Sequence, residues 1–161
     1  MSDIPATVPD PAGTRDIVST RVFPHSASVV FSAFTDDRRL AKWWGPAGFT
    51  STFHEFDLRP GGRWRFTMQG PDGARYENES QFLEISAPRR IVLRHLSRPG
   101  FRMTITVADE PAGTRVTWRM EFATAEECAQ VSRYAVDANE QNFDRLAALL
   151  AATNRGRKRR T

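Results

Sequence analysis

Between residues 49 and 122 the chain contains six short segments in which apolar and polar residues alternate, and this run restricts the fold more than any other feature. The segment 101–107, for example, reads Phe-Arg-Met-Thr-Ile-Thr-Val. A period of two places the apolar side chains of a β-strand on one face, so each segment predicts a strand with one buried face. Short turns rich in Gly and Pro join the segments, which favours an antiparallel meander. The six predicted strands cover residues 49–58, 63–69, 75–86, 90–96, 101–107 and 115–122.

A further strand and two short helices are predicted before this meander. The strand covers residues 15–23. Ser26 or Ser28 can cap the first helix and Thr35 the second, because hydroxyl oxygens accept hydrogen bonds from the free N–H groups at a helix start. The apolar face of the second helix consists of Leu40, Trp43 and Trp44, at positions i, i+3 and i+4.

The last predicted element is a long amphipathic helix of about seven turns. Thr124 and Glu127 have the spacing of a capping box at its start, and Asn154 and Gly156 are expected to end it. One stripe of this helix is apolar except for a single Asn, and it consists of Cys128, Val131, Ala135, Ala138, Asn142, Leu146 and Leu149. Such a stripe must cover the apolar face of the sheet. The sequence therefore predicts an α+β fold, in which a curved seven-stranded antiparallel sheet wraps around the C-terminal helix and two short helices follow the first strand.

The chain divides into three predicted parts, of which only one is a folded domain. Residues 1–14 are expected to form an irregular leader, residues 15–152 a single domain, and residues 153–161 a basic C-terminal tail. Five basic residues lie between positions 155 and 160, and without them the net charge of +4 becomes −1. The body is therefore not expected to bind nucleic acid, and only weak binding through the tail is predicted.

Several classes of protein are disfavoured by what the sequence lacks. Cys128 is the only cysteine, so no intrachain disulfide can form. The sequence shows neither a signal peptide nor a run of eighteen apolar residues, so we expect a cytoplasmic protein without a membrane span. His25, His54 and His95 are scattered, and no phosphate-binding loop is present. The sequence therefore predicts no metal site and no cofactor.

The turn between the strands 49–58 and 63–69 contains two consecutive glycines. Asp57 and Arg59 are expected to fix this turn, because Asp is a common turn residue. Gly61 and Gly62 predict a tight bend with at least one residue at positive φ, where a side chain would cost energy.

Several motifs resemble those of a known superfamily. They are LAKWWGP at residues 40–46, FDLRPGGRWRF at 56–66, GPDG at 70–73 followed by Tyr76 and Asn78, and DRLA at 144–147. Together with the order of elements, they resemble the START-like helix-grip superfamily, also called SRPBCC. Within it, the chain is similar to the homologues of the activator of the heat-shock-chaperone ATPase. The resemblance covers about residues 15–151.

This resemblance implies the helix-grip fold but leaves several functions open. Members of the superfamily carry apolar small molecules, cyclise polyketides, confer antibiotic resistance by self-sacrifice or activate a chaperone, and many bacterial members have no assigned ligand. The last helix departs from the family pattern. Relatives often have Gly-x-x-x-Thr-Leu before Asp-Arg-Leu, whereas residues 138–143 read Ala-Asn-Glu-Gln-Asn-Phe. Larger or more polar residues thus stand where this helix should face a cavity.

The candidate site is a cavity between the sheet and the long helix. Tyr76, Asn78, Ser80 and Phe82 share one face of their strand, and facing inward they would bring rings and polar groups together, as ligand sites require. In the alternative orientation, Leu83 and the residues in phase with it, such as Ile85, face inward. The predicted ligand-binding residues are Trp43, Trp44, Trp64, Phe66, Met68, Tyr76, Asn78, Phe82, His95, Met103, Trp118 and Ala138.

Three functions are compatible with such a cavity, and they rank in the following order. The first is binding of a small, largely apolar or aromatic molecule without catalysis, by a monomer or a homodimer. The second is a cyclase- or hydrolase-type enzyme acting on an aromatic or polyketide-like substrate, with Tyr76, His95, His54 or Glu55 as acid or base. The third is a chaperone-associated module that binds a protein partner through an exposed apolar patch. No residue is assigned a catalytic role.

Overall fold

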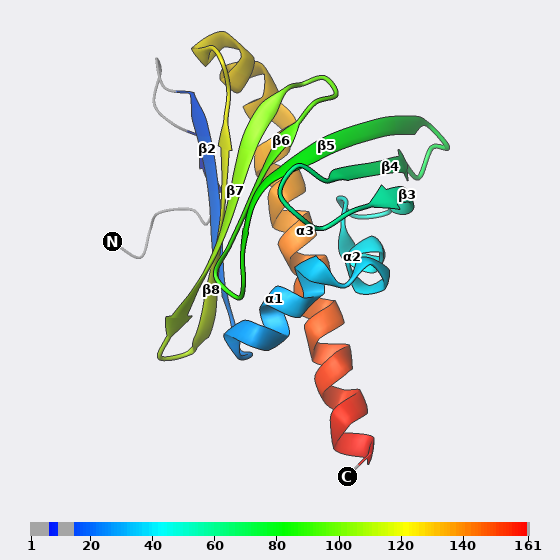
Figure 1. Ribbon diagram of the computed structural model, residues 1–161, viewed down its shortest axis with the longest axis vertical. Helices are drawn as coiled ribbons and strands as arrows, with labels where there is room; N and C mark the ends of the chain where they lie inside the picture. The colour runs from blue at the N-terminus through cyan, green and yellow to red at the C-terminus, as the bar shows by residue number, and fades with distance from the viewer. Residues whose placement is uncertain (1–6, 10–14, 161) are drawn as a thin grey trace.

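The computed structural model describes the backbone of residues 7–9 and 15–160 and the side chains of residues 15–152. The elements follow the predicted order of strand, two short helices, six strands and long helix, with one extra short strand at the start (Figure 1). Their bounds are β1 Thr7–Pro9, β2 Asp16–Phe23, α1 Ala27–Thr35, α2 Asp37–Trp43, β3 Thr50–Phe56, β4 Arg63–Gln69, β5 Arg75–Ser86, β6 Arg90–His95, β7 Phe101–Glu110, β8 Gly113–Glu121 and α3 Ala125–Arg160.

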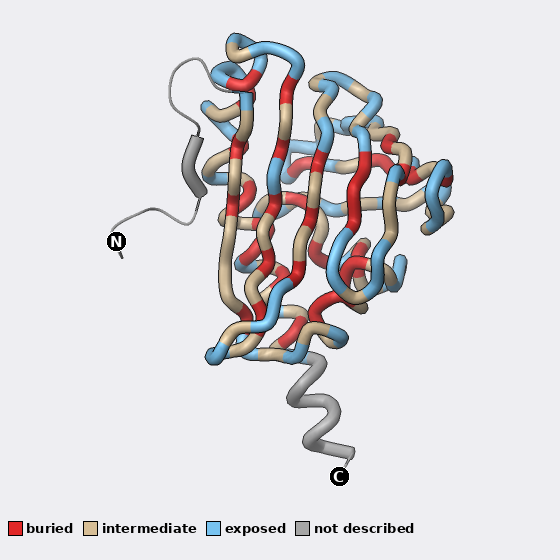
Figure 2. The backbone as a smooth tube through the Cα atoms, turned by 60° about the vertical axis from the view of Figure 1, so that its left-hand side comes forward, coloured by how far each residue is buried: buried red, intermediate tan, exposed pale blue. Residues whose placement is uncertain are grey.

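Strands β2 to β8 form the predicted seven-stranded antiparallel sheet, in the order β2-β8-β7-β6-β5-β4-β3. The first and last of these strands along the chain are therefore neighbours in the sheet. β2 pairs with β8 along its whole length, from Asp16 opposite Glu121 to Phe23 opposite Thr114. Buried and exposed residues alternate along the strands, as expected for a sheet with one covered face (Figure 2). β1 pairs with the free edge of β2, so the prediction of an irregular leader is wrong for Thr7–Pro9.

Side-chain caps set where the helices begin. Ser26 caps α1 and Thr124 caps α3, as predicted, each with a hydroxyl oxygen that accepts a backbone N–H bond three residues on. Asp36 caps α2, so the prediction of Thr35 is wrong. The Asp36 carboxylate accepts the N–H of Arg38 at 3.0 Å, and a carboxylate also interacts favourably with the positive end of the helix dipole.

α3 is longer than predicted. It continues to Arg160, past Asn154 and Gly156, where the sequence predicts its end. One glycine costs a helix only about 1 kcal/mol, which the favourable residues around it can offset. Residues 153–160 of the predicted basic tail thus continue the helical backbone, and their side chains lie outside the described part of the chain.

The segment of α3 from Phe143 to Leu150 is packed more fully than the predicted stripe suggests. Phe143, which lies outside that stripe, is fully buried, with its ring centroid 4.8 Å from Trp118 and 5.9 Å from Phe23. Leu150 is fully buried in place of Leu149, which is only partly buried. This segment therefore belongs to a solid core, and any open space must lie along the part of α3 before Phe143.

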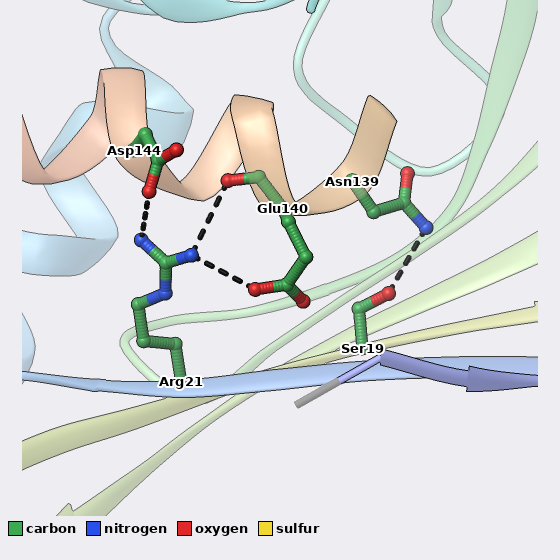
Figure 3. A network of polar contacts seen from close by, with 5 residues as sticks. All are labelled: Ser19, Arg21, Asn139, Glu140 and Asp144. Carbon is green, nitrogen blue, oxygen red and sulfur yellow. Dashed lines mark hydrogen bonds and ion pairs between the residues drawn. The ribbon is translucent and has the colours of Figure 1, made fainter. Parts of the chain in front are cut away.

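Polar contacts fasten the middle of α3 to β2 (Figure 3). The Arg21 guanidinium donates to the carboxylates of Asp144 at 2.8 Å and Glu140 at 2.9 Å, and it lies 5.5 Å from the centre of the Phe143 ring. One turn earlier, the amide nitrogen of Asn139 donates to the Ser19 hydroxyl at 3.0 Å. α3 is thus held on one side of the sheet.

Candidate ligand-binding cavity

A cavity of about 780 Å³ lies between the sheet and the N-terminal half of α3. Pockets for small ligands commonly measure roughly 300–1,000 Å³, so this volume suits a small molecule. Its wall comes from the α2–β3 loop, β4, β5, β6, the β6–β7 loop, β7, β8 and α3. Rings and methionines dominate the wall, and they are Trp44, Phe49, Trp64, Phe66, Met68, Tyr76, Phe101, Met103, Trp118, Met120 and Tyr134.

Ten of the predicted ligand-binding residues lie together on this wall. They are Trp44, Trp64, Phe66, Met68, Tyr76, Asn78, His95, Met103, Trp118 and Ala138. The structure thus brings together residues from five strands, α3 and the α2–β3 loop.

Trp43 and Phe82 do not line the cavity, and their prediction as wall residues needs correction. Trp43 is 1% exposed, and its indole N–H donates to the carbonyl oxygen of Ala33 in α1 at 3.0 Å. Phe82 is 2% exposed, and its ring lies parallel to that of Trp64 at 6.2 Å between centroids. Both rings pack in the core instead.

β5 faces inward with Tyr76, Asn78 and Ser80, which all line the cavity. Leu83 is 39% exposed, so the alternative orientation is wrong for this residue. The pairing of β5 with β6 shifts between Phe82 and Glu84, which is a β-bulge. The bulge adds one residue to the alternation, so Ile85 packs against the same core as Phe82. Alternation alone does not show such a shift.

The structure adds wall residues that sequence reasoning missed. Phe101 and Met120 stand two positions from Met103 and Trp118, so the same alternation already contained the signal for them. Tyr134 had no such signal, because it lies off the apolar stripe of α3, and the residue is 58% exposed. The other missed wall residues are Pro46, Phe49, Arg75, Glu77, Leu93, Arg98, Pro99 and Asn139. Ser80 lines the cavity from the predicted inward face of its strand, and Val131, Ala135 and Asn142 line it from the predicted stripe of α3.

His95 is a polar group of the wall that neighbouring groups hold in place. Its Nδ1 lies 2.9 Å from the carbonyl oxygen of Pro99, and its Nε2 lies 2.9 Å from Oδ1 of Asn78. The imidazole stacks on Phe101, with 4.7 Å between ring centroids. Burial lowers the pKa of His95, and this effect outweighs the backbone hydrogen bond to Pro99, which raises it. Burial thus favours the neutral imidazole, which can donate to only one of these two oxygens.

We expect His95 to make the domain less stable in mild acid. Because its pKa is lower in the folded state, the unfolded chain binds the proton more readily. Stability should therefore fall as the pH drops below about 6.5, the ordinary pKa of His. Urea denaturation between pH 7.5 and 5.5 should show this fall in the wild type and a flatter profile in His95→Gln. Parallel profiles for the two proteins would show that His95 has the same pKa in the folded and unfolded states.

The α2–β3 loop, which forms one end of the cavity, is held by polar side chains of α3. The Arg145 guanidinium donates to the carbonyl oxygens of Lys42 at 2.9 Å and Gly45 at 2.8 Å. The Oδ1 atom of Asn142 accepts the N–H of Gly45 at 2.8 Å. These bonds fix the backbone on either side of Trp44, so the position of this ring in the wall depends on α3.

Arg145→Met should loosen this end of the cavity. The variant keeps an unbranched side chain but leaves the carbonyl groups without their charged donor, a loss of about 2 kcal/mol in unfolding free energy. Chemical denaturation should measure this loss. Arg133→Met changes an exposed residue of the same helix and should have little effect. Equal stability of the two variants would mean that the Arg145 hydrogen bonds contribute nothing to the free energy of unfolding.

The remaining acid–base candidates lie elsewhere. His54 places Nε2 2.7 Å from the Thr67 hydroxyl, and Glu55 lies 3.5 Å from the Arg65 guanidinium; neither residue lines the cavity. Of the four candidates, the cavity therefore contains Tyr76 and His95. Within the described residues, no three His, Cys, Asp or Glu side chains come close enough to hold a metal ion. No described helix is long and apolar enough to cross a membrane.

A curved antiparallel sheet wrapped around a long helix, with a cavity between them, defines a helix-grip domain of the START-like type. The family model described as Activator of Hsp90 ATPase homolog 1-like protein matches residues 24–151. The chain belongs to this family.

Solved structures share the fold across most of the chain. Protein Ms6760 from Mycobacterium smegmatis is 26% identical, with a TM-score of 0.80 over 89% of this chain and 94% of that one. Protein CV1439 from Chromobacterium violaceum is 27% identical, with a TM-score of 0.76 over 83% and 96% of the two chains. The AHSA1 protein from Silicibacter pomeroyi is 22% identical, with a TM-score of 0.68 over 86% and 99%. No curated protein matches the sequence significantly.

Proposed function

We propose that this protein binds a small, largely apolar or aromatic molecule in the cavity without changing a covalent bond. The observation that carries this proposal is the cavity of about 780 Å³ with a wall made mainly of rings and methionines. Burial of apolar surface gives roughly 25 cal/mol per Å², so an apolar guest gains free energy by leaving water. Methionine side chains can adapt to the shape of such a guest.

Small side chains on α3 help to keep this space open. Ala135 and Ala138 both line the cavity from the helix, where larger apolar residues would reach toward the sheet. At the entrance, the wall residues Tyr76 and Tyr134 are 50% and 58% exposed. An aromatic ring with a hydroxyl group suits an opening that is wet on one side and apolar on the other.

The enzyme alternative receives less support from the same geometry. An acid–base mechanism needs at least one positioned group that can take or give a proton. Both nitrogens of His95 lie within hydrogen-bonding distance of protein oxygens, and the exposed Tyr76 has no acid or base partner among the described residues. The Glu77 carboxylate at the rim accepts a bond from the Thr67 hydroxyl at 2.7 Å. These contacts favour orientation of a ligand over proton transfer.

A titration with a neutral fluorescent probe tests the proposal. N-phenyl-1-naphthylamine is nearly dark in water and bright in apolar surroundings. We expect saturable binding of one probe per chain, quenching of tryptophan fluorescence by energy transfer, and a melting temperature that rises with probe concentration. If neither this probe nor other neutral two-ring aromatics show saturable binding or a thermal shift, the proposed function is wrong.

A further inference from the structure

Asn139 is a polar residue of α3 that lines the cavity although it is only 7% exposed. Its amide nitrogen donates to the hydroxyl of Ser19 in β2 at 3.0 Å, and the same nitrogen lies 3.6 Å from the sulfur of Met120 in β8. One end of this amide is therefore bound to the sheet.

The contact with Met120 decides which end of the amide that is. A thioether sulfur is a weak acceptor and has no hydrogen to donate, so it can pair with the nitrogen of the amide and not with its oxygen. The Ser19 hydroxyl can pair with either end. The nitrogen therefore faces the sheet, and Figure 3 shows Oδ1 of Asn139 on the side away from Ser19.

This Oδ1 atom accepts no hydrogen bond from the described residues and is not fully enclosed. Of the described residues, the buried side-chain nitrogen and oxygen atoms that are both enclosed and unpaired are the indole nitrogens of Trp64 and Trp118. Oδ1 of Asn139 does not belong to this group, so it keeps accessible surface. Because the rest of the residue is buried and the residue lines the cavity, a molecule in the cavity is the partner that can reach this oxygen.

We propose that the ligand carries a neutral hydrogen-bond donor, such as a phenolic hydroxyl or an aromatic N–H, which Oδ1 of Asn139 accepts. This inference rests on the proposed function, since it names the chemistry of the molecule in the same cavity. A ligand with such a donor gains a bond that a purely apolar molecule of the same shape cannot make. A cationic donor fits less well, because the described wall carries Arg75 and Arg98 against a single acid, Glu77.

Two probes of the same shape test the inference. 2-Naphthol and 2-methylnaphthalene differ only in OH against CH₃, and each is titrated in competition with N-phenyl-1-naphthylamine. In the wild type we expect the two affinities to lie within about threefold, whereas a hydroxyl without an acceptor would favour 2-methylnaphthalene by about tenfold or more. The second outcome would contradict the inference even if no variant folds.

Substitutions of Asn139 then test which atom meets the ligand. The measured quantity is the affinity for 2-naphthol divided by that for 2-methylnaphthalene. We expect Asn139→Leu to lower this ratio about tenfold, the effect of one net hydrogen bond. Asn139→Asp keeps an acceptor but removes the N–H group, so its ratio should not fall. A fall as large as that of Asn139→Leu would show that the nitrogen meets the ligand, and the inference would be wrong.

Ser19→Ala is the matched control, because it removes the same hydrogen bond between α3 and β2 but keeps Oδ1 of Asn139, and Ser19 does not line the cavity. Its ratio should equal that of the wild type. An equal fall in Ser19→Ala and Asn139→Leu would overturn the inference, because Asn139 would then act only by holding α3 on the sheet. If both probes displace the reporter but the ratio is the same in every variant, the donor inference is wrong and the proposed function stands. If neither the probes nor the reporter bind, both are wrong.

Discussion

Replacing Ala138 by Trp is expected to lower the affinity for N-phenyl-1-naphthylamine about a hundredfold while the domain stays folded. Ala138 lines the cavity from α3, so a large ring there would occupy space that the probe needs. The loss of about 100 Å² of apolar contact, at about 25 cal/mol per Å², amounts to ~2.5 kcal/mol, close to a factor of one hundred. Fluorescence titration measures the affinity, and urea denaturation measures the stability.

Ala148→Trp provides the control for this substitution. Ala148 lies on the same helix but is exposed and outside the cavity, so the probe should bind this variant as it binds the wild type. In a solid core, Ala138→Trp would overpack the interior and cost roughly 1–3 kcal/mol or more. A strongly destabilised Ala138→Trp, together with unchanged probe binding in any molecules that fold, would contradict the cavity.

Gly62→Ala is expected to destabilise the domain by about 3 kcal/mol, a large effect for a single added methyl group. A Cβ at Gly62 would lie 2.0 Å from the carbonyl oxygen of Asp57 and 3.0 Å from that of Arg59. Both contacts are with backbone, which cannot turn aside as a side chain can. The turn is also bonded to β5, because the carbonyl oxygen of Gly62 accepts the N–H of Phe82 at 2.9 Å. Moving the turn would therefore disturb the sheet next to Trp64.

Gly61→Ala separates this steric effect from backbone preference. Gly61 has a φ of +86°, which confirms the predicted positive φ in this turn, and a Cβ there would meet nothing within 4 Å. Only the cost of the left-handed conformation remains, about 1 kcal/mol. Denaturation curves for the two variants should differ accordingly. A Gly62→Ala protein as stable as Gly61→Ala would show that the Asp57 turn relaxes easily.

Most of the sheet and much of the cavity wall could be predicted from alternation. The period of two places Trp64, Phe66 and Met68 on one face of β4, and all three line the cavity. The same pattern in β7 and β8 placed Met103 and Trp118 correctly on the wall. This success has a simple cause, since a sheet with one covered face has only one way to bury its apolar residues.

The two neighbouring tryptophans show where helical periodicity fails. Spacing alone places Trp43 and Trp44 on one face of α2. In the structure α2 ends at Trp43, and Trp44 is the C-cap residue with extended φ and ψ of −71° and 118°. The change of backbone conformation sends the second ring into the cavity wall, while the first stays against α1. A helix end known only to within one or two residues cannot separate these two positions.

The contacts that shape the Trp44 end of the cavity join residues far apart in sequence. Asn142 and Arg145 bind the backbone of Gly45 from 97 and 100 positions away. Contacts over such separations leave no periodic signal in the sequence. The sequence therefore indicates only that Asn142 is a polar residue in an apolar stripe. The structure gives the reason for this polar residue, because the Oδ1 atom of Asn142 accepts the N–H of Gly45 where α3 packs against the loop.

Native mass spectrometry of the protein purified gently from its own host tests the cavity most directly. We expect the wild-type chain to carry a noncovalent small organic molecule that is lost on denaturation. Ala138→Trp, prepared in the same way, should show the mass of the bare chain, and Ala148→Trp should retain the adduct. An adduct of the same mass on wild type and Ala138→Trp would place the molecule outside the cavity. A bare wild-type chain that also fails to bind N-phenyl-1-naphthylamine would contradict the binding function itself.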